Sequence, residues 1–95
     1  DILSVGRYDF SVIHVPGHSP GSLVFSCAKA GVAFSGDVLF QNSIGRTDLW
    51  GGNYEVLISG IQEKLFILPD STVIYPGHGP STTIGYEKTH NPYLQ

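Results

Sequence analysis

Two Pro-Gly pairs stand directly after apolar, strand-like runs, and each pair is followed by a histidine. These histidines are His18 and His78 of the 95-residue chain, and a third apolar run ends just before Asp37. Pro and Gly interrupt regular structure, and loops at strand ends are where a rigid scaffold presents reactive groups. The sequence therefore predicts short strands whose exits carry His18, Asp37 and His78.

The composition limits the class of protein. Ninety-five residues make at most one domain, and an apolar fraction of 41% is typical of a globular protein. The chain contains no apolar run of the roughly 20 residues that span a bilayer and no signal-peptide pattern. A net charge of −3 without a Lys/Arg cluster argues against nucleic-acid binding. The single Cys27 cannot form an internal disulfide, so nothing demands an oxidising compartment and we expect a cytoplasmic protein. Without a membrane-spanning run, we expect no membrane partner.

The hydrophobic pattern predicts an α/β chain with one mostly antiparallel sheet of about five strands and two helices. Asn53 is expected to cap a helix that ends before Pro69, and Thr82-Thr83 to cap a shorter one. Residues 37–53 have no periodicity and are predicted as a long, ordered loop. Two helices cover only one face of such a sheet, so the other face needs a partner. The expected strands are 2–5, 8–15, 22–27, 32–35 and 71–75.

The candidate metal ligands are His18, Asp37 and His78. Imidazole and carboxylate groups are the ligands that a borderline divalent cation such as zinc prefers. His14 precedes His18 by four residues, but Pro16 and the glycine after it exclude the helix that would make this spacing a ligand pair. We therefore interpret His14 as an inward-facing or supporting residue, and we expect His90, which has no motif around it, to be structural.

Two other features leave alternatives open. Residues 17–21 match the Gly-x-Ser-x-Gly pattern of serine hydrolases around Ser19, but a strand-like run follows where that motif requires a helix. The segment 45–52 contains Arg46 and Asp48, which we expect to form an ion pair that rigidifies the loop. The alternative is that Arg46 faces an anionic substrate.

Five ordered motifs resemble the metallo-β-lactamase-fold hydrolases, and among them the type II glyoxalase-like (hydroxyacylglutathione hydrolase-like) branch. The resemblance extends over nearly the whole chain, and the order of the motifs makes it specific. The matching segments are Pro-Gly-His-Ser-Pro-Gly-Ser at 16–22, Gly-Asp-Val-Leu-Phe at 36–40, Gly-Arg-Thr-Asp-Leu-Trp-Gly-Gly at 45–52, Pro-Gly-His-Gly at 76–79 and Asn-Pro-Tyr-Leu at 91–94.

The resemblance implies a role for each candidate residue. His18 corresponds to a ligand of one metal, His78 to a ligand of a second, and Asp37 to the catalytic carboxylate that bridges them. It implies a binuclear zinc centre, with iron or manganese as other metals, whose bound hydroxide attacks a small-molecule thioester. The alternative within the same fold is an iron-dependent persulfide dioxygenase, and one of another class is a non-catalytic scaffold half-domain.

One expected part of the family pattern is absent. The His-x-His-x-Asp-His motif of the family's first half does not occur, and the chain begins at Asp1 without a methionine. We therefore expect residues 1–95 to be the C-terminal half of an αββα sandwich, inactive alone. A homo-oligomer or the missing N-terminal half is expected to cover the exposed sheet. Larger members bind glutathione through a further C-terminal segment, which residues 1–95 do not include, so we expect no glutathione specificity from these residues and leave the thiol carrier open.

Overall fold

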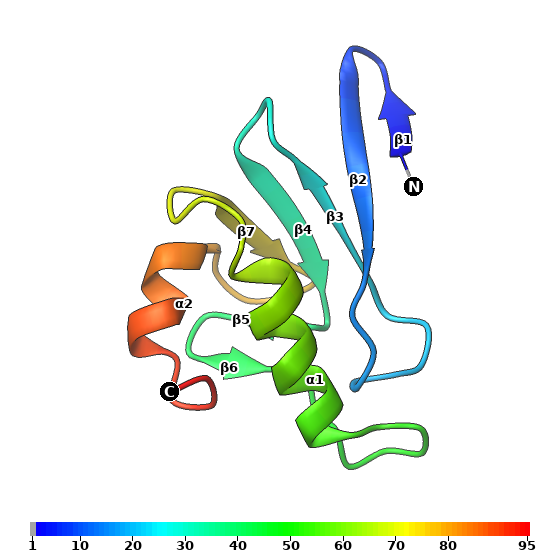
Figure 1. Ribbon diagram of the computed structural model, residues 1–95, viewed down its shortest axis with the longest axis vertical. Helices are drawn as coiled ribbons and strands as arrows, with labels where there is room; N and C mark the ends of the chain where they lie inside the picture. The colour runs from blue at the N-terminus through cyan, green and yellow to red at the C-terminus, as the bar shows by residue number, and fades with distance from the viewer. Residues whose placement is uncertain (1) are drawn as a thin grey trace.

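A six-stranded sheet forms the centre of the computed structural model, which describes residues 2–95. The strand order is β1-β2-β3-β4-β7-β8, and all neighbours are antiparallel except β4 and β7, which are parallel (Figure 1). This confirms the predicted α/β class, with β8 as an additional short edge strand. The strands are β1 (Ile2–Val5), β2 (Tyr8–His14), β3 (Leu23–Cys27), β4 (Val32–Gly36), β7 (Val73–Pro76) and β8 (Thr82–Thr83).

The segment between β4 and the first helix is not the plain loop that the sequence predicted. It contains a small hairpin of β5 (Leu39–Phe40) and β6 (Ser43–Ile44), with the turn residue Asn42 at a φ of 60°. Two-residue strands are too short to show an alternating pattern, which is why periodicity did not indicate them.

The first helix begins where predicted and ends earlier. The Asn53 side chain accepts a hydrogen bond from the Val56 amide and so caps α1 (Tyr54–Gly60). The helix continues as the π-helical turn η1 (Ile61–Leu65), in which the Phe66 amide donates to the Ile61 carbonyl. The second helix, α2 (Ile84–His90), is capped by Thr83 alone.

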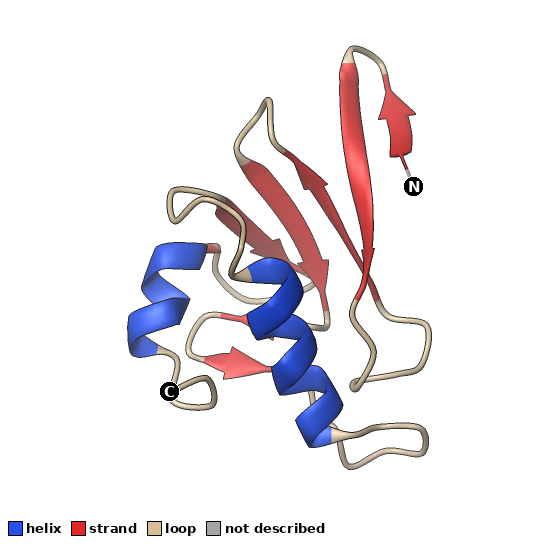
Figure 2. Cartoon of the chain, viewed as in Figure 1, coloured by secondary structure: helices blue, strands red, loops and turns tan. Residues whose placement is uncertain are grey.

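The core lies between the sheet and the helices. Figure 2 shows the helices gathered on one side of the six-stranded sheet. None of the helices in residues 2–95 is both long enough and apolar enough to cross a membrane. The fully buried side chains of this layer include Val24, Ala33 and Ile74 from the sheet and Leu57, Ile61, Leu65 and Ile84 from the helices.

The opposite face of the sheet carries apolar side chains that no element of residues 2–95 covers. The Phe34 ring packs between those of Phe10 and Tyr75, at centroid distances of 5.9 and 5.7 Å. Phe34 and Tyr75 are nevertheless each 44% exposed, and Leu23 on the same face is 43% exposed. The chain thus has one packed face and one open, aromatic face.

Strand direction brings the three candidate ligands to one edge of the sheet. β2 and β4 run the same way because each is antiparallel to β3, and β7 is parallel to β4. Their carboxyl ends therefore meet at a single edge. His18 follows β2, Asp37 follows β4 and His78 follows β7, so segments far apart in sequence emerge side by side.

Candidate functional site

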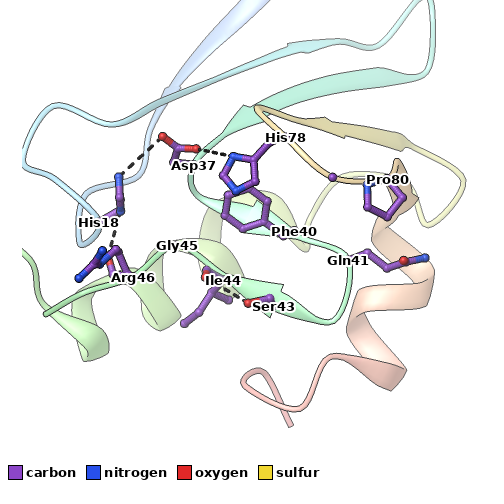
Figure 3. A pocket seen from close by; sticks show the side chains of 11 residues that line it. His18, Asp37, Phe40, Gln41, Ser43, Ile44, Gly45, Arg46, His78 and Pro80 are labelled. Atoms are coloured by element: carbon purple, nitrogen blue, oxygen red, sulfur yellow. Dashed lines mark hydrogen bonds and ion pairs between the residues drawn. The ribbon is translucent and has the colours of Figure 1, made fainter.

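A pocket of about 490 Å³ lies at this edge of the sheet. Figure 3 shows the three candidate ligands along one side of it and the β5–β6 hairpin along the other. Its lining residues are His18, Asp37, Phe40, Gln41, Ser43, Ile44, Gly45, Arg46, His78, Gly79 and Pro80.

The carboxylate of Asp37 lies between the two imidazoles. Its Oδ2 is 3.9 Å from Nε2 of His18, and its Oδ1 is 3.5 Å from Nδ1 of His78 (Figure 3). Each histidine therefore faces a different oxygen of the same carboxylate. The side chain of Asp37 is about half exposed, so a ligand can reach it from the pocket.

The ring of His18 is oriented by a backbone carbonyl. Its Nδ1 lies 2.9 Å from the carbonyl oxygen of Arg46. Because a carbonyl only accepts, Nδ1 donates in this contact, and Nε2, the nitrogen nearer Asp37, is left as the atom that can bind a metal ion. An imidazole held in this way is poised as a metal ligand, since histidines that bind metals usually donate their other N–H to such a partner.

The ring of His78 rests on an aromatic side chain instead. The Phe40 ring, from the β5–β6 hairpin, lies 4.7 Å from it, centroid to centroid. The His78 side chain is 78% exposed, and the Phe40 ring supports it on one face while Asp37 lies beside its Nδ1. Although Phe40 is part of the Gly-Asp-Val-Leu-Phe motif, sequence reasoning gave it no role.

Two glycines permit the close approach of these segments. A Cβ at Gly45 would lie 1.9 Å from the carbonyl oxygen of Asp37, so a side chain there would push the hairpin away from the ligands. Gly17, at a φ of 128°, lies against Leu57 of α1 so closely that a Cβ would be 2.4 Å from the Leu57 Cβ. Its carbonyl also accepts from the Asn53 amide at 2.7 Å, which fixes the loop before His18 to the start of α1.

The donor set fits a bridging carboxylate better than a single-ion site. Among residues 2–95, no three His, Cys, Asp or Glu side chains are grouped closely enough to hold one ion. The two imidazoles lie beside opposite oxygens of Asp37, the arrangement of a carboxylate shared between two cations with one histidine for each. Zinc sites use three or four protein ligands, so each ion would need further ligands beyond those in this chain.

Arg46 and Asp48 form the ion pair that we favoured from the sequence. Nε and Nη2 of Arg46 donate to the two carboxylate oxygens of Asp48 at 2.9 and 3.1 Å. The hydrogen bond from Arg46 lowers the pKa of Asp48 from its ordinary value, and the same bond raises the pKa of Arg46. Both side chains are largely exposed. The backbone carbonyl of the same Arg46 bonds to His18.

The remaining candidates lie outside the pocket. His14 is exposed, not inward-facing, and its Nε2 is hydrogen-bonded to the Pro20 carbonyl in the loop that carries His18. His90 stacks on Tyr86, which agrees with a structural role. The Ser19 hydroxyl is bonded to that of Ser22, and β3 follows it in place of a helix, so the structural context that a serine nucleophile requires is absent.

Comparisons with known proteins identify the family of the chain. Residues 1–78 match the model of the metallo-beta-lactamase superfamily. The hydroxyacylglutathione hydrolase GloC of Haemophilus influenzae is 51% identical over 99% of this chain and 44% of its own length. The chain thus spans less than half the length of the curated relatives it matches.

Two solved structures are closely similar. The BLEG-1 B3 metallo-beta-lactamase superposes with a TM-score of 0.93 at 55% identity, over 98% of this chain and 44% of that one. TTHA1623 in a di-iron-bound form superposes with a TM-score of 0.85 at 46% identity, over 90% and 42%. Since the family model covers most of the sequence and the fold agrees over nearly all of it, this chain belongs to the metallo-beta-lactamase superfamily.

Proposed function

We propose that this chain supplies half of the active site of a full-length, metal-dependent hydrolase that acts on thioesters. The observation that carries the proposal is the Asp37 carboxylate, with one oxygen facing each of two imidazoles. The similarity to GloC supports a hydroxyacyl thioester as the substrate class. His18 and His78 would each bind one ion of a two-ion centre, and Asp37 would lie between the two ions and bind both.

The residues of this chain would bind and orient the two metal ions, and the ions would activate the substrate and the attacking water molecule. Two divalent cations held by these residues would polarise a carbonyl and lower the pKa of a water molecule. Asp37 would hold the two ions together, and the Arg46 carbonyl would keep Nε2 of His18 directed toward its ion. The pocket of about 490 Å³ is in the size range of small-molecule sites and leaves room for the acyl group beside Phe40.

The ligand set does not by itself fix the identity of the metal. Zinc suits two imidazoles and a carboxylate, and TTHA1623 was solved in a di-iron-bound form. We propose zinc as the resident metal, with iron as the alternative that metal analysis of the purified full-length protein decides.

The test compares two aspartate variants of the full-length protein. Asp37→Asn is expected to lower kcat/KM for a hydroxyacyl thioester by more than about 100-fold and to reduce the bound metal, because loss even of a residue that merely orients a ligand costs roughly 10- to 100-fold. Asp9→Asn is the matched control, since Asp9 lies at the end of β2 away from His18 and, within residues 2–95, its side chain bonds only to Ser4. It should change neither quantity.

Assays of the same full-length protein distinguish the competing activities. Thioester hydrolysis that a chelator abolishes supports the proposal. Oxygen uptake on a glutathione persulfide without thioester hydrolysis would identify the dioxygenase alternative. A full-length protein that binds no metal at all would identify a non-catalytic scaffold. Either result, or full activity in Asp37→Asn, would overturn the proposal.

A further inference from the structure

Two polar side chains of α2 and the turn after it are completely buried although they lie outside the pocket. Glu87 and Asn91 are both 0% exposed. A buried carboxylate is costly unless hydrogen bonds satisfy it. Within residues 2–95 no buried side-chain nitrogen or oxygen lacks a partner, so this pair must be satisfied by its surroundings. The groups to which Glu87 and Asn91 are hydrogen-bonded indicate their role.

Glu87 accepts hydrogen bonds from three separate parts of the chain. Its Oε1 accepts from the backbone amide of Asn42 at 3.0 Å and from Nδ2 of the Asn91 side chain at 2.9 Å. Its Oε2 accepts from the hydroxyl of Thr82 on β8. The carboxylate therefore joins the edge strand, α2 and the turn of the β5–β6 hairpin.

Asn91 completes the connection to the hairpin. Its Nδ2 donates a second bond, to the Ser43 carbonyl at 3.0 Å, and its Oδ1 accepts from the Tyr93 amide at 3.0 Å. Tyr86 of α2 adds a bond from its hydroxyl to Oδ1 of Asn42 at 2.9 Å. Together these contacts hold a turn whose residue Asn42 has a φ of 60°, a conformation that L-residues seldom adopt.

The hairpin held in this way carries the contacts that orient both candidate histidines. Phe40, on β5, packs against the His78 ring. Beyond β6, Gly45 lies against the Asp37 backbone and the Arg46 carbonyl bonds to His18. Figure 3 shows Phe40 beside His78 and Arg46 beside His18. A displacement of the Asn42 turn would therefore move the supports of both rings at once.

We propose that Glu87 and Asn91 are positioning residues, which fix the β5–β6 hairpin and through it the orientation of His18 and His78. They touch neither the candidate ligands nor the pocket. The positioning itself follows from the hydrogen bonds, whereas its consequence for metal affinity rests on the function proposed above.

The experiment measures zinc affinity and the histidine ring NMR signals of the full-length protein. Asn91→Ala removes the donors to Ser43 and Glu87, and we expect it to weaken zinc binding roughly 10- to 100-fold and to shift the ring signals of His18 and His78. Glu87→Gln keeps the oxygen that accepts from Asn42 and Asn91, so it should retain an affinity close to that of the parent protein.

A stability control separates positioning from general destabilisation. Ile84→Val truncates a buried core residue of α2 that takes no part in these hydrogen bonds, and it should lower the melting temperature without changing zinc affinity or the ring signals. If Asn91→Ala does not fold, Tyr86→Phe takes its place. It removes only the bond to Oδ1 of Asn42 and should weaken zinc binding to a smaller extent in the same direction.

Two outcomes would overturn the inference. One is that Asn91→Ala, or its substitute, leaves zinc affinity and ring signals unchanged. The other is that zinc affinity falls in Ile84→Val as much as in Asn91→Ala, which would mean that only stability matters. If the parent protein binds neither zinc nor iron, the proposed function fails, and the ring signals alone then decide the positioning: a shift in Asn91→Ala supports it and no shift overturns it.

Discussion

The groups that orient the candidate ligands are mostly contributed by the backbone. His18 is held by the carbonyl of Arg46, and the hairpin approaches Asp37 only because residue 45 has no side chain. Although their role as ligands stays a prediction, the three candidate ligands could be selected from the sequence because Pro and Gly around them marked the strand exits. The orienting groups could not, since any residue has a carbonyl and only the fold decides which one is near.

The Arg46–Asp48 pair leads to a prediction about pH. The pKa of Asp48 is lowered in the folded chain by the hydrogen bond from Arg46. Its stabilising contribution is therefore present above the ordinary aspartate pKa, about 3.9, and is lost as the pH falls through the lowered value. In Arg46→Gln, the titration midpoint of Asp48, followed by NMR, should rise toward the ordinary value.

A second ion pair provides the control for this titration. Lys88→Gln breaks the pair between Lys88 and Asp70, whose nitrogen and oxygen lie 2.7 Å apart, and should leave the Asp48 midpoint unchanged. A midpoint in Arg46→Gln equal to that of the parent would contradict the assigned cause.

Among the elements, those with a sustained pattern were predicted well. β1 to β4 follow the alternation of the sequence, and α1 begins at its Asn53 cap because an amide oxygen is suited to bond the first free amides of a helix. The β5–β6 hairpin was missed because two residues per strand carry no period. Glu87 lies in the short helix that the sequence predicted after Thr82-Thr83, and its burial follows from the hairpin that lies against it.

The cap of α1 can be tested directly. Asn53→Ala removes the acceptor for the Val56 amide and is expected to lower the free energy of unfolding of the full-length protein by about 1 kcal/mol, measured by urea denaturation. Asn53→Asp is the matched control, since it keeps a capping oxygen and should unfold near the parent midpoint. Equal stability of Asn53→Ala and the parent would show that the helix start does not depend on this side chain.

At the scale of the whole molecule, the main feature is the open aromatic face of the sheet. An exposed apolar surface of this kind is typical of an interface. We propose that the other half of the full-length protein covers it and that, in the absence of that half, a second copy of this chain does so. The covering half would also provide the metal ligands that His18, Asp37 and His78 leave to be supplied, so the isolated chain should bind zinc weakly and show no hydrolysis.

Sedimentation of the isolated 95-residue chain tests the open face. We expect a mass above that of the monomer, and Phe34→Lys should shift the chain toward the monomer because it places a charge in the centre of the face. Ile67→Lys is the control, since Ile67 is 77% exposed but follows η1 on the helical side. A parent chain that sediments as a monomer and binds no apolar dye would contradict the proposal.

The sequence by itself determined the fold class, most strand positions, the start of the first helix and the three candidate ligands, because these depend on local pattern and on the chemistry of single residues. Only the tertiary structure decided that the ligands meet around one carboxylate and that a buried Glu-Asn pair holds the hairpin beside them. Those facts depend on strand direction and on contacts between residues more than 40 positions apart, such as Asn42 with Glu87, which no local pattern encodes.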